Sequence, residues 1–156
     1  MQLQEIADVA DDYTGRSRTV LEYSLVMKSL VDRAEQHGFT TGSWSPLAEL
    51  VATDEFVRVG NFKEVMNWTE YVGFLTNWAP SAQWEGSFKR ITETPDVVIL
   101  ELEERSSVGE FSNVVNSVSI YEFDDAGKIT RIDLYLQMAL PENAMLGSYE
   151  DVQISK

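Results

Sequence analysis

The segment VVILELEERSS, residues 97–107, carries the charged side chains whose spacing best suits chemistry. Glu101, Glu103 and Arg105 recur at every second position, which predicts one polar face of a β-strand. The opposite face is apolar and consists of Val98, Leu100 and Leu102. Inside an apolar pocket, desolvation would make the carboxylate of Glu103 a stronger base, and Arg105 would orient it or bind an anionic substrate group.

Two orientations of this strand are open from the sequence. In the first, the apolar residues pack against helices while Glu101 and Glu103 face water or a partner subunit, as charged strand faces usually do. In the second, a β-bulge within residues 103–105 switches the face locally and turns Glu103 and Arg105 inward. The direction of these two side chains therefore decides whether the strand has a catalytic role.

Other candidate site residues are aromatic, amide or imidazole side chains on other predicted elements. Tyr23 lies on the core face of a helix, where its hydroxyl is either a packed, satisfied group or a donor to a developing oxyanion. Trp68 and Trp84 have polar neighbours, which favours partial exposure at the mouth of a pocket for a flat apolar ligand. Asn116 interrupts an apolar strand face and needs a partner or a ligand if that face is buried. His37 falls at a helix end and is interpreted as a structural cap rather than a general base.

Composition excludes several classes of site and partner. The 156 residues suit one domain, and 44% hydrophobic with 11% aromatic residues are enough for a core. With no cysteine and one histidine, thiol catalysis and a multi-histidine metal site are excluded, and no metal or cofactor is expected. A net charge of −14 disfavours nucleic acid and anionic membranes as partners. The acidic start MQLQEIADVADD is unlike a signal peptide and no apolar run spans a bilayer, so a soluble cytoplasmic protein is expected.

The first half of the chain has helical patterns. Residues 3–10 have apolar helical spacing, which indicates a short or frayed helix before the main fold. Thr19 followed by Glu22 has the capping-box spacing, and an apolar face then runs to a possible C-cap at Gly38. These signals predict a long amphipathic helix from Val20 to about His37.

Shorter elements follow this helix. Ser45-Pro46 is an N-cap followed by a proline at the first helical position, and residues 55–59 alternate as a short strand. Asn67 with Glu70 caps a further helix that ends before Pro80.

After Pro80 the pattern changes to strands. Four strand-like runs follow, at residues 83–92, 97–107, 113–123 and 129–138. Turn residues at 94–96 and 124–127 separate them. Helices followed by hairpins predict an α+β fold with helices on one face of a curved antiparallel sheet. We expect a single domain over residues 1–156, with a core at about 19–138 and a C-terminal tail, 141–156, that is loop or partly disordered.

The order of these elements and the ending SIYEFDDAGKITRIDLYLQ, residues 119–137, resemble the nuclear transport factor 2-like (NTF2-like) superfamily. The nearest likeness is to its SnoaL-like branch, whose relatives include polyketide cyclases, ketosteroid isomerases and limonene epoxide hydrolases. The resemblance implies a cone-shaped barrel in which helices close the concave face of the sheet around a mostly apolar pocket. It also implies a homodimer.

The catalytic residues of these relatives match this chain only in part. Arg105 matches the arginine of the epoxide hydrolases, but Ser107 and Leu134 stand where their two aspartates would be, which makes that hydrolase activity doubtful. The aspartate base of the ketosteroid isomerases would fall at about Val59. Their enolate-holding tyrosine would correspond to Tyr23, and Leu134 becomes an apolar residue that lines the pocket.

The favoured interpretation is a cofactor-independent acid–base isomerase, cyclase or dehydratase that acts on a small apolar organic molecule. Its catalytic residues would be Glu103, Arg105 and Tyr23, and its substrate-binding residues Trp68, Trp84, Asn116 and Leu134. Two alternatives stay open. One is a non-catalytic protein that binds a hydrophobic ligand in the same pocket, and the other is a protein–protein interaction domain whose cone is filled by its own side chains.

Overall fold

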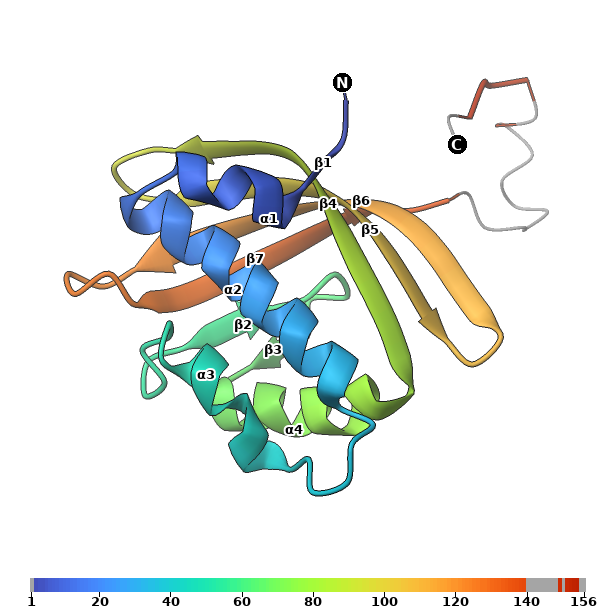
Figure 1. The fold of residues 1–156 in the computed structure, drawn as a ribbon. Coiled ribbons are helices and arrows are strands. Elements are labelled where there is room, and N and C mark those ends of the chain that lie inside the picture. Colours follow the sequence, from blue (N-terminus) through green and yellow to red (C-terminus); the bar gives the residue numbers. More distant parts are fainter. Residues whose placement is uncertain (1, 140–148, 150, 155–156) are drawn as a thin grey trace.

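A curved sheet of seven strands carries the fold, and the long helix α2 lies across one face of it (Figure 1). The structure is a computed structural model that describes residues 2–139, 149 and 151–154, so most of the predicted tail lies outside it. The strand order is β1-β4-β5-β6-β7-β2-β3. All neighbouring strands are antiparallel except β2 and β7, which are parallel. The predicted α+β cone is confirmed, with this one parallel pair as the exception to an antiparallel sheet.

The strands vary greatly in length. They are β1 (Gln4–Glu5), β2 (Val57–Val59), β3 (Val65–Met66), β4 (Ala82–Glu93), β5 (Val98–Val108), β6 (Phe111–Phe123) and β7 (Ile129–Gln137). The α-helices are α1 (Ile6–Val9), α2 (Gly15–Arg33), α3 (Ser45–Ala48) and α4 (Trp68–Trp78). Short 3-10 turns are η1 (Ala10–Asp12), η2 (Thr41–Trp44) and η3 (Ala79–Ser81).

Helix α2 starts and ends earlier than its sequence pattern predicts. It begins at Gly15, and Thr19, the predicted cap, lies inside it and donates its hydroxyl to the Gly15 carbonyl at 3.2 Å. The Glu93 carboxylate of β4 instead accepts hydrogen bonds from the backbone N–H and the hydroxyl of Ser17, at 3.0 and 2.8 Å. This N-terminal cap comes from a residue 76 positions away, so local spacing could not reveal it.

The start of α4 follows its sequence signal. Asn67 accepts from the Glu70 N–H at 2.8 Å and Glu70 accepts from the Asn67 N–H at 3.1 Å, which confirms the predicted capping box. The β6–β7 turn also has the expected chemistry, because Asp124 accepts from the N–H groups of Ala126 and Lys128 and Gly127 adopts a φ of 81°.

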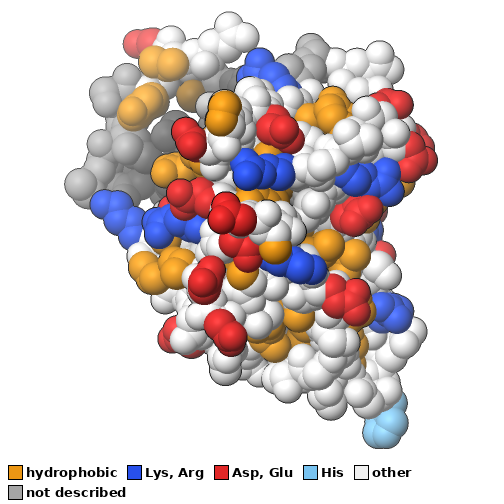
Figure 2. Space-filling view, turned by 90° about the vertical axis from the view of Figure 1, so that its left-hand side faces the viewer, with side chains coloured by type: hydrophobic (Ala, Val, Ile, Leu, Met, Phe, Trp, Pro, Cys, Tyr) orange, Lys and Arg blue, Asp and Glu red, His pale blue; other side chains and the backbone are white. Residues whose placement is uncertain are grey.

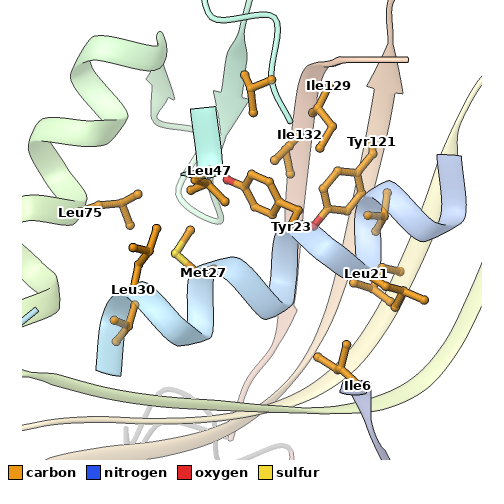
Figure 3. Packing of buried hydrophobic residues seen from close by; sticks show 14 of the residues in the cluster. Ile6, Leu21, Tyr23, Met27, Leu30, Leu47, Leu75, Tyr121, Ile129 and Ile132 are labelled. Carbon is orange, nitrogen blue, oxygen red and sulfur yellow. The ribbon is translucent and has the colours of Figure 1, made fainter. Parts of the chain in front are cut away.

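The core lies between α2 and the sheet face that α2 covers, which we call the inner face. Figure 3 shows Tyr23 of α2 against Tyr121 and Ile132 of the sheet, with Met27 and Leu30 extending toward Leu75 of α4. The strongest burial is on the central strands and α2, where Val20, Leu21, Val98 and Ile129 are all fully buried. The opposite face is called the outer face, and side chains alternate between the two along each strand.

Candidate functional site

The orientation of β5 decides which charged residues can reach the interior. Leu102 is buried on the inner face, the pairing of β5 with β6 runs without a shift from residue 98 to 108, and no residue of β5 is skipped in its pairing with β4. Strict alternation then places Glu103 and Arg105 on the outer face and Glu104 on the inner face. The second orientation, in which a β-bulge within residues 103–105 turns Glu103 and Arg105 inward, is therefore wrong, since the register shift of this region lies in β4, between Phe88 and Arg90.

Glu103 and Arg105 do meet, but on the outer face. The Arg105 guanidinium donates to Glu103 at 2.9 Å and to the Ser87 hydroxyl at 2.9 Å, and lies 3.6 Å from Glu85. The predicted orienting contact between arginine and glutamate is therefore present. Its position away from the core fits the first orientation considered for this strand, in which the charged face points to water or a partner.

Asn116 belongs to the same outer-face network. It pairs with Glu103 across the β5–β6 ladder, accepts from Lys89 at 2.9 Å and donates to Gln137 at 2.9 Å. Its polar groups thus have protein partners and need no ligand to satisfy them.

Glu104 is the carboxylate that β5 turns inward. Its carboxylate accepts a hydrogen bond from the indole N–H of Trp84 at 2.6 Å, and both side chains are partly buried. Its partner in β4 is Gly86, which has no side chain to occupy the neighbouring inner position. The predicted pocket residue Trp84 is therefore an inner-face residue, and it holds the one carboxylate among the inner-facing residues of β5, β6 and β7.

A second charged group enters the inner face from β2. Arg58 pairs with Met66 and Ile132, and Ile132 is buried on the inner face. The Arg58 guanidinium lies 4.7 Å from the centre of the Tyr71 ring and 3.8 Å from the Glu64 carboxylate, with 15% of its side chain exposed. Burial alone would lower the pKa of Arg58, but Tyr71, Tyr23 and Glu64 raise it above its usual value. Arg58 therefore stays charged inside a largely apolar layer.

Tyr23 lies where the sequence predicts, on the core side of α2. Its hydroxyl is buried and has no hydrogen-bond partner within the described residues. Burial raises the pKa of Tyr23 well above its usual value, the Tyr71 and Tyr121 hydroxyls raise it further, and Arg58 lowers it. The Tyr71 hydroxyl is thus near the Tyr23 hydroxyl, although no hydrogen bond of acceptable geometry joins these two hydroxyls. The Tyr23 and Tyr121 rings meet edge to face, 6.0 Å apart.

The remaining predicted residues fall in different places. Trp68 meets the rings of Phe56 and Tyr71 at 5.2 and 6.3 Å, so it belongs to the aromatic wall beside Arg58. Leu134 faces inward from β7. His37 is exposed beyond the end of α2, and in Figure 2 the pale blue histidine projects from the lower end of the molecule.

One large hollow surrounds the end of the β5–β6 hairpin. It has a volume of about 1430 Å³ and lies among α2, β4, β5, β6, the end of β7 and part of the C-terminal segment. Four predicted site residues line it: Trp84, Glu103, Arg105 and Asn116. Trp84 belongs to the inner face, whereas Glu103, Arg105 and Asn116 belong to the outer face. The hollow therefore extends over both faces of the sheet, and only part of its volume lies on the inner face. Tyr23, Trp68, Leu134 and Glu104 do not line the hollow, but Trp84, which does, is the hydrogen-bond partner of Glu104.

Residues 2–139, 149 and 151–154 contain neither a metal-binding cluster nor a membrane-spanning helix. No group of three or more histidine, aspartate or glutamate side chains there could hold a metal ion. No helix in the same residues is long and apolar enough to cross a membrane.

Comparison with known proteins places this geometry in a familiar fold. No family model matches the sequence, and a search of curated proteins finds no match. Among solved structures, a protein provisionally described as a SnoaL-like polyketide cyclase from Jannaschia sp. CCS1 shares 14% identity at a TM-score of 0.54, over 85% of this chain and 88% of its own.

Two further structures give the same picture. An epoxide hydrolase of M. tuberculosis, described as LEH-like, shares 14% identity at a TM-score of 0.53, over 71% of this chain and 83% of its own. An NTF2-like protein of unknown function from Shewanella oneidensis MR-1 shares 10% identity at a TM-score of 0.55, over 76% of this chain and 98% of its own. At such identities the likeness establishes the fold, and it agrees with the resemblance seen in the sequence: the chain adopts the NTF2-like fold that SnoaL-like proteins share.

Proposed function

We propose that this protein is a cofactor-independent acid–base enzyme that isomerises, cyclises or dehydrates a small, largely apolar organic molecule. The observation that carries the proposal is the inward carboxylate of Glu104, held by Trp84 at 2.6 Å, because the other inner-facing residues of β5, β6 and β7 are uncharged. A carboxylate so placed can take a proton from the carbon beside a carbonyl and return it to another carbon. Glu104 thus takes the role that the sequence suggested for Glu103.

A hydroxyl for the other half of this chemistry comes from Tyr121, which is buried and faces inward from β6. Burial raises the pKa of Tyr121, as do Tyr71 and the charge of Glu104, so the Tyr121 hydroxyl stays protonated. A neutral hydroxyl in an apolar site can donate to an oxygen on which negative charge develops. The Tyr23 ring meets the Tyr121 ring edge to face at 6.0 Å and adds a second buried hydroxyl to this part of the core.

Trp84 has two roles in the proposed site. Its indole N–H fixes the carboxylate, and its ring lines the hollow while Glu104 does not. A substrate in the hollow can therefore contact Trp84, the hydrogen-bond partner of Glu104. An aromatic ring at this position suits a flat apolar substrate.

The test is turnover of a panel of apolar β,γ-unsaturated cyclic ketones to their conjugated isomers, followed by the ultraviolet absorbance of the conjugated enone. We expect Glu104→Gln to lower kcat/KM by about a hundredfold or more, the range of a lost general base. Glu103→Gln and Glu101→Gln are matched controls, because they remove outer-face carboxylates of the same strand. A Glu104→Gln enzyme as active as the wild type, or a loss confined to Glu103→Gln, would refute the assignment.

A non-catalytic ligand-binding protein is the second candidate. The apolar inner face of β7, formed by Ile132, Leu134 and Leu136, favours it because these side chains offer packing but no chemistry. In that case the ketone panel would bind saturably to the wild type without turnover above the buffer rate. The predicted homodimer stays a proposal as well; exposed Val114 and Tyr135 on the outer face are consistent with a second copy there.

A further inference from the structure

The guanidinium of Arg58 has hydrogen-bonding capacity that the described protein groups do not use. Arginine carries five N–H donors. In the described part of the chain its neighbours are the Tyr71 ring at 4.7 Å and the Glu64 carboxylate at 3.8 Å, and the latter distance is too long for a hydrogen bond. With 15% of the side chain exposed, the group is reachable from solvent while it sits on the inner face.

An unpartnered hydroxyl belongs to the same cluster. The Tyr23 hydroxyl is buried without a partner, and the charge of Arg58 is close enough to lower its pKa. An unsatisfied buried donor costs free energy, and such a group in a native fold calls for an explanation. A ligand oxygen between Arg58 and Tyr23 would satisfy both.

Glu64 is the described carboxylate that forms an ion pair with Arg58. Its carboxylate folds back over the β2–β3 turn, where it accepts from the Phe62 N–H at 2.9 Å and faces Arg58. A Cβ at Gly60 would lie only 1.7 Å from this carboxylate, so the glycine leaves room for it. The contact with Arg58 is long and partly exposed, with 37% of the Glu64 side chain open to solvent, which makes the pair weak. A better-placed anion can therefore replace Glu64.

The surroundings of Arg58 specify the rest of the ligand. Tyr71, Phe56 and Trp68 form an aromatic wall with ring centres 5.2–6.3 Å apart. We propose that Arg58, with the Tyr23 hydroxyl, binds the carboxylate of an otherwise apolar, ring-containing ligand, and that Glu64 is the displaceable counter-ion of this site. The claim that this ligand is the substrate rests on the proposed function. The claim that Arg58 binds a carboxylate can be tested by binding alone, without turnover.

The experiment is calorimetric titration of the wild-type protein with 2-naphthoate and with its neutral analogue 2-naphthamide. Since charge-assisted hydrogen bonds are stronger than neutral ones, naphthoate should bind about tenfold more tightly or better. Arg58→Met should remove this preference, and Glu64→Gln should tighten naphthoate binding about twofold to fivefold by removing the competitor. Tyr23→Phe should weaken naphthoate binding. The control is Arg131→Met, which removes an outer-face arginine that is paired with Asp133 at 2.7 Å and should leave the preference intact.

Several outcomes would overturn the proposal. They are equal affinity for the two compounds, no binding of either, an unchanged preference in Arg58→Met, and a preference lost in Arg131→Met. If Arg58→Met does not fold, Glu64→Gln decides, since no gain in naphthoate affinity then refutes the counter-ion role. Glu104→Gln should keep the naphthoate preference, so failure of this site and failure of the proposed acid–base chemistry give different results.

Discussion

Replacing Tyr23 with phenylalanine removes one oxygen from the core and leaves the ring in place. The Tyr23 side chain is only 5% exposed, and its hydroxyl has no partner among the described residues. An unsatisfied buried hydroxyl costs about 1–3 kcal/mol, of which nearby dipoles recover part, so Tyr23→Phe should raise the free energy of unfolding by about 0.5–2 kcal/mol at pH 7. Urea denaturation followed by tryptophan fluorescence measures this change.

The same substitution should change the response to alkaline pH. Burial is the main cause that raises the pKa of Tyr23, so the native state holds its proton above pH 10, where the unfolded chain releases it. A group with a raised native pKa stabilises the fold fully below its unfolded pKa, and that contribution is lost as pH rises toward the native value. The loss is about 1.4 kcal/mol per pH unit for each such tyrosine. Between pH 10 and 11.5 the stability of Tyr23→Phe should therefore fall less steeply than that of the wild type.

Thr76→Val supplies the contrasting control. The Thr76 hydroxyl accepts from the indole N–H of Trp44 at 3.0 Å and donates to the Val72 carbonyl at 2.7 Å, and Trp44 is 1% exposed. Removing this satisfied hydroxyl at nearly constant volume should cost about 1–3 kcal/mol because the indole N–H loses its partner. If Tyr23→Phe destabilised the protein as much as Thr76→Val, the Tyr23 hydroxyl would have a native partner, and the reasoning about the Arg58 cluster would fail.

Three further predictions concern other parts of the sheet. Gly60→Ala should cost less than about 1 kcal/mol, because the flexible Glu64 carboxylate can move away from the new Cβ, and it should tighten 2-naphthoate binding in calorimetry as Glu64→Gln does. Leu100→Ala should lower the free energy of unfolding by about 2–5 kcal/mol in urea denaturation, since this side chain is 1% exposed in the core. Arg90→Met should destabilise the protein slightly at neutral pH and not in acid, because the hydrogen bond from Arg90 lowers the pKa of Glu101. The stability that this ion pair contributes is lost as pH falls through the range in which Glu101 is protonated. Salt should screen the same contribution in the same denaturation assay.

The architecture could be predicted because its signals are local and repeat many times. Alternation along β5 and β7 identifies their buried residues, and the Asn67–Glu70 pair marks the start of α4 within one turn. The limits of α2 could not be predicted in the same way. Its N-terminus is capped by Glu93, whose position beside Ser17 depends on the packing of the helix on the sheet.

The site residues were harder to identify because they break the usual distribution of charge. Glu104 lies two residues after buried Leu102, and Arg58 lies two residues after buried Phe56. Alternation along a strand alone therefore places each charged residue on the same face as the buried one. A buried carboxylate or guanidinium is rare, and a charged strand face is far more often solvated, which makes the outward residues Glu103 and Arg105 look like the more natural chemical pair. What the sequence cannot show is that Trp84 and the Tyr71 ring meet these two charges from other elements.

The two inward charges lie at different levels of the cone, which constrains any ligand that uses both. Arg58 is aligned with Val98 of β5 through the paired residues Ile132 and Tyr121. Glu104 lies six residues beyond Val98, which is about 20 Å in a flat strand. Both charges nevertheless affect the pKa of Tyr121, which Glu104 raises and Arg58 lowers. Benzoate bound at Arg58 is too short to reach Glu104, so Glu104→Gln should leave its affinity unchanged. A carboxylate on three or four fused rings should extend to Glu104, and its affinity should change in that variant. If the two carboxylates respond alike, the acid–base site and the anion site are not parts of one cavity.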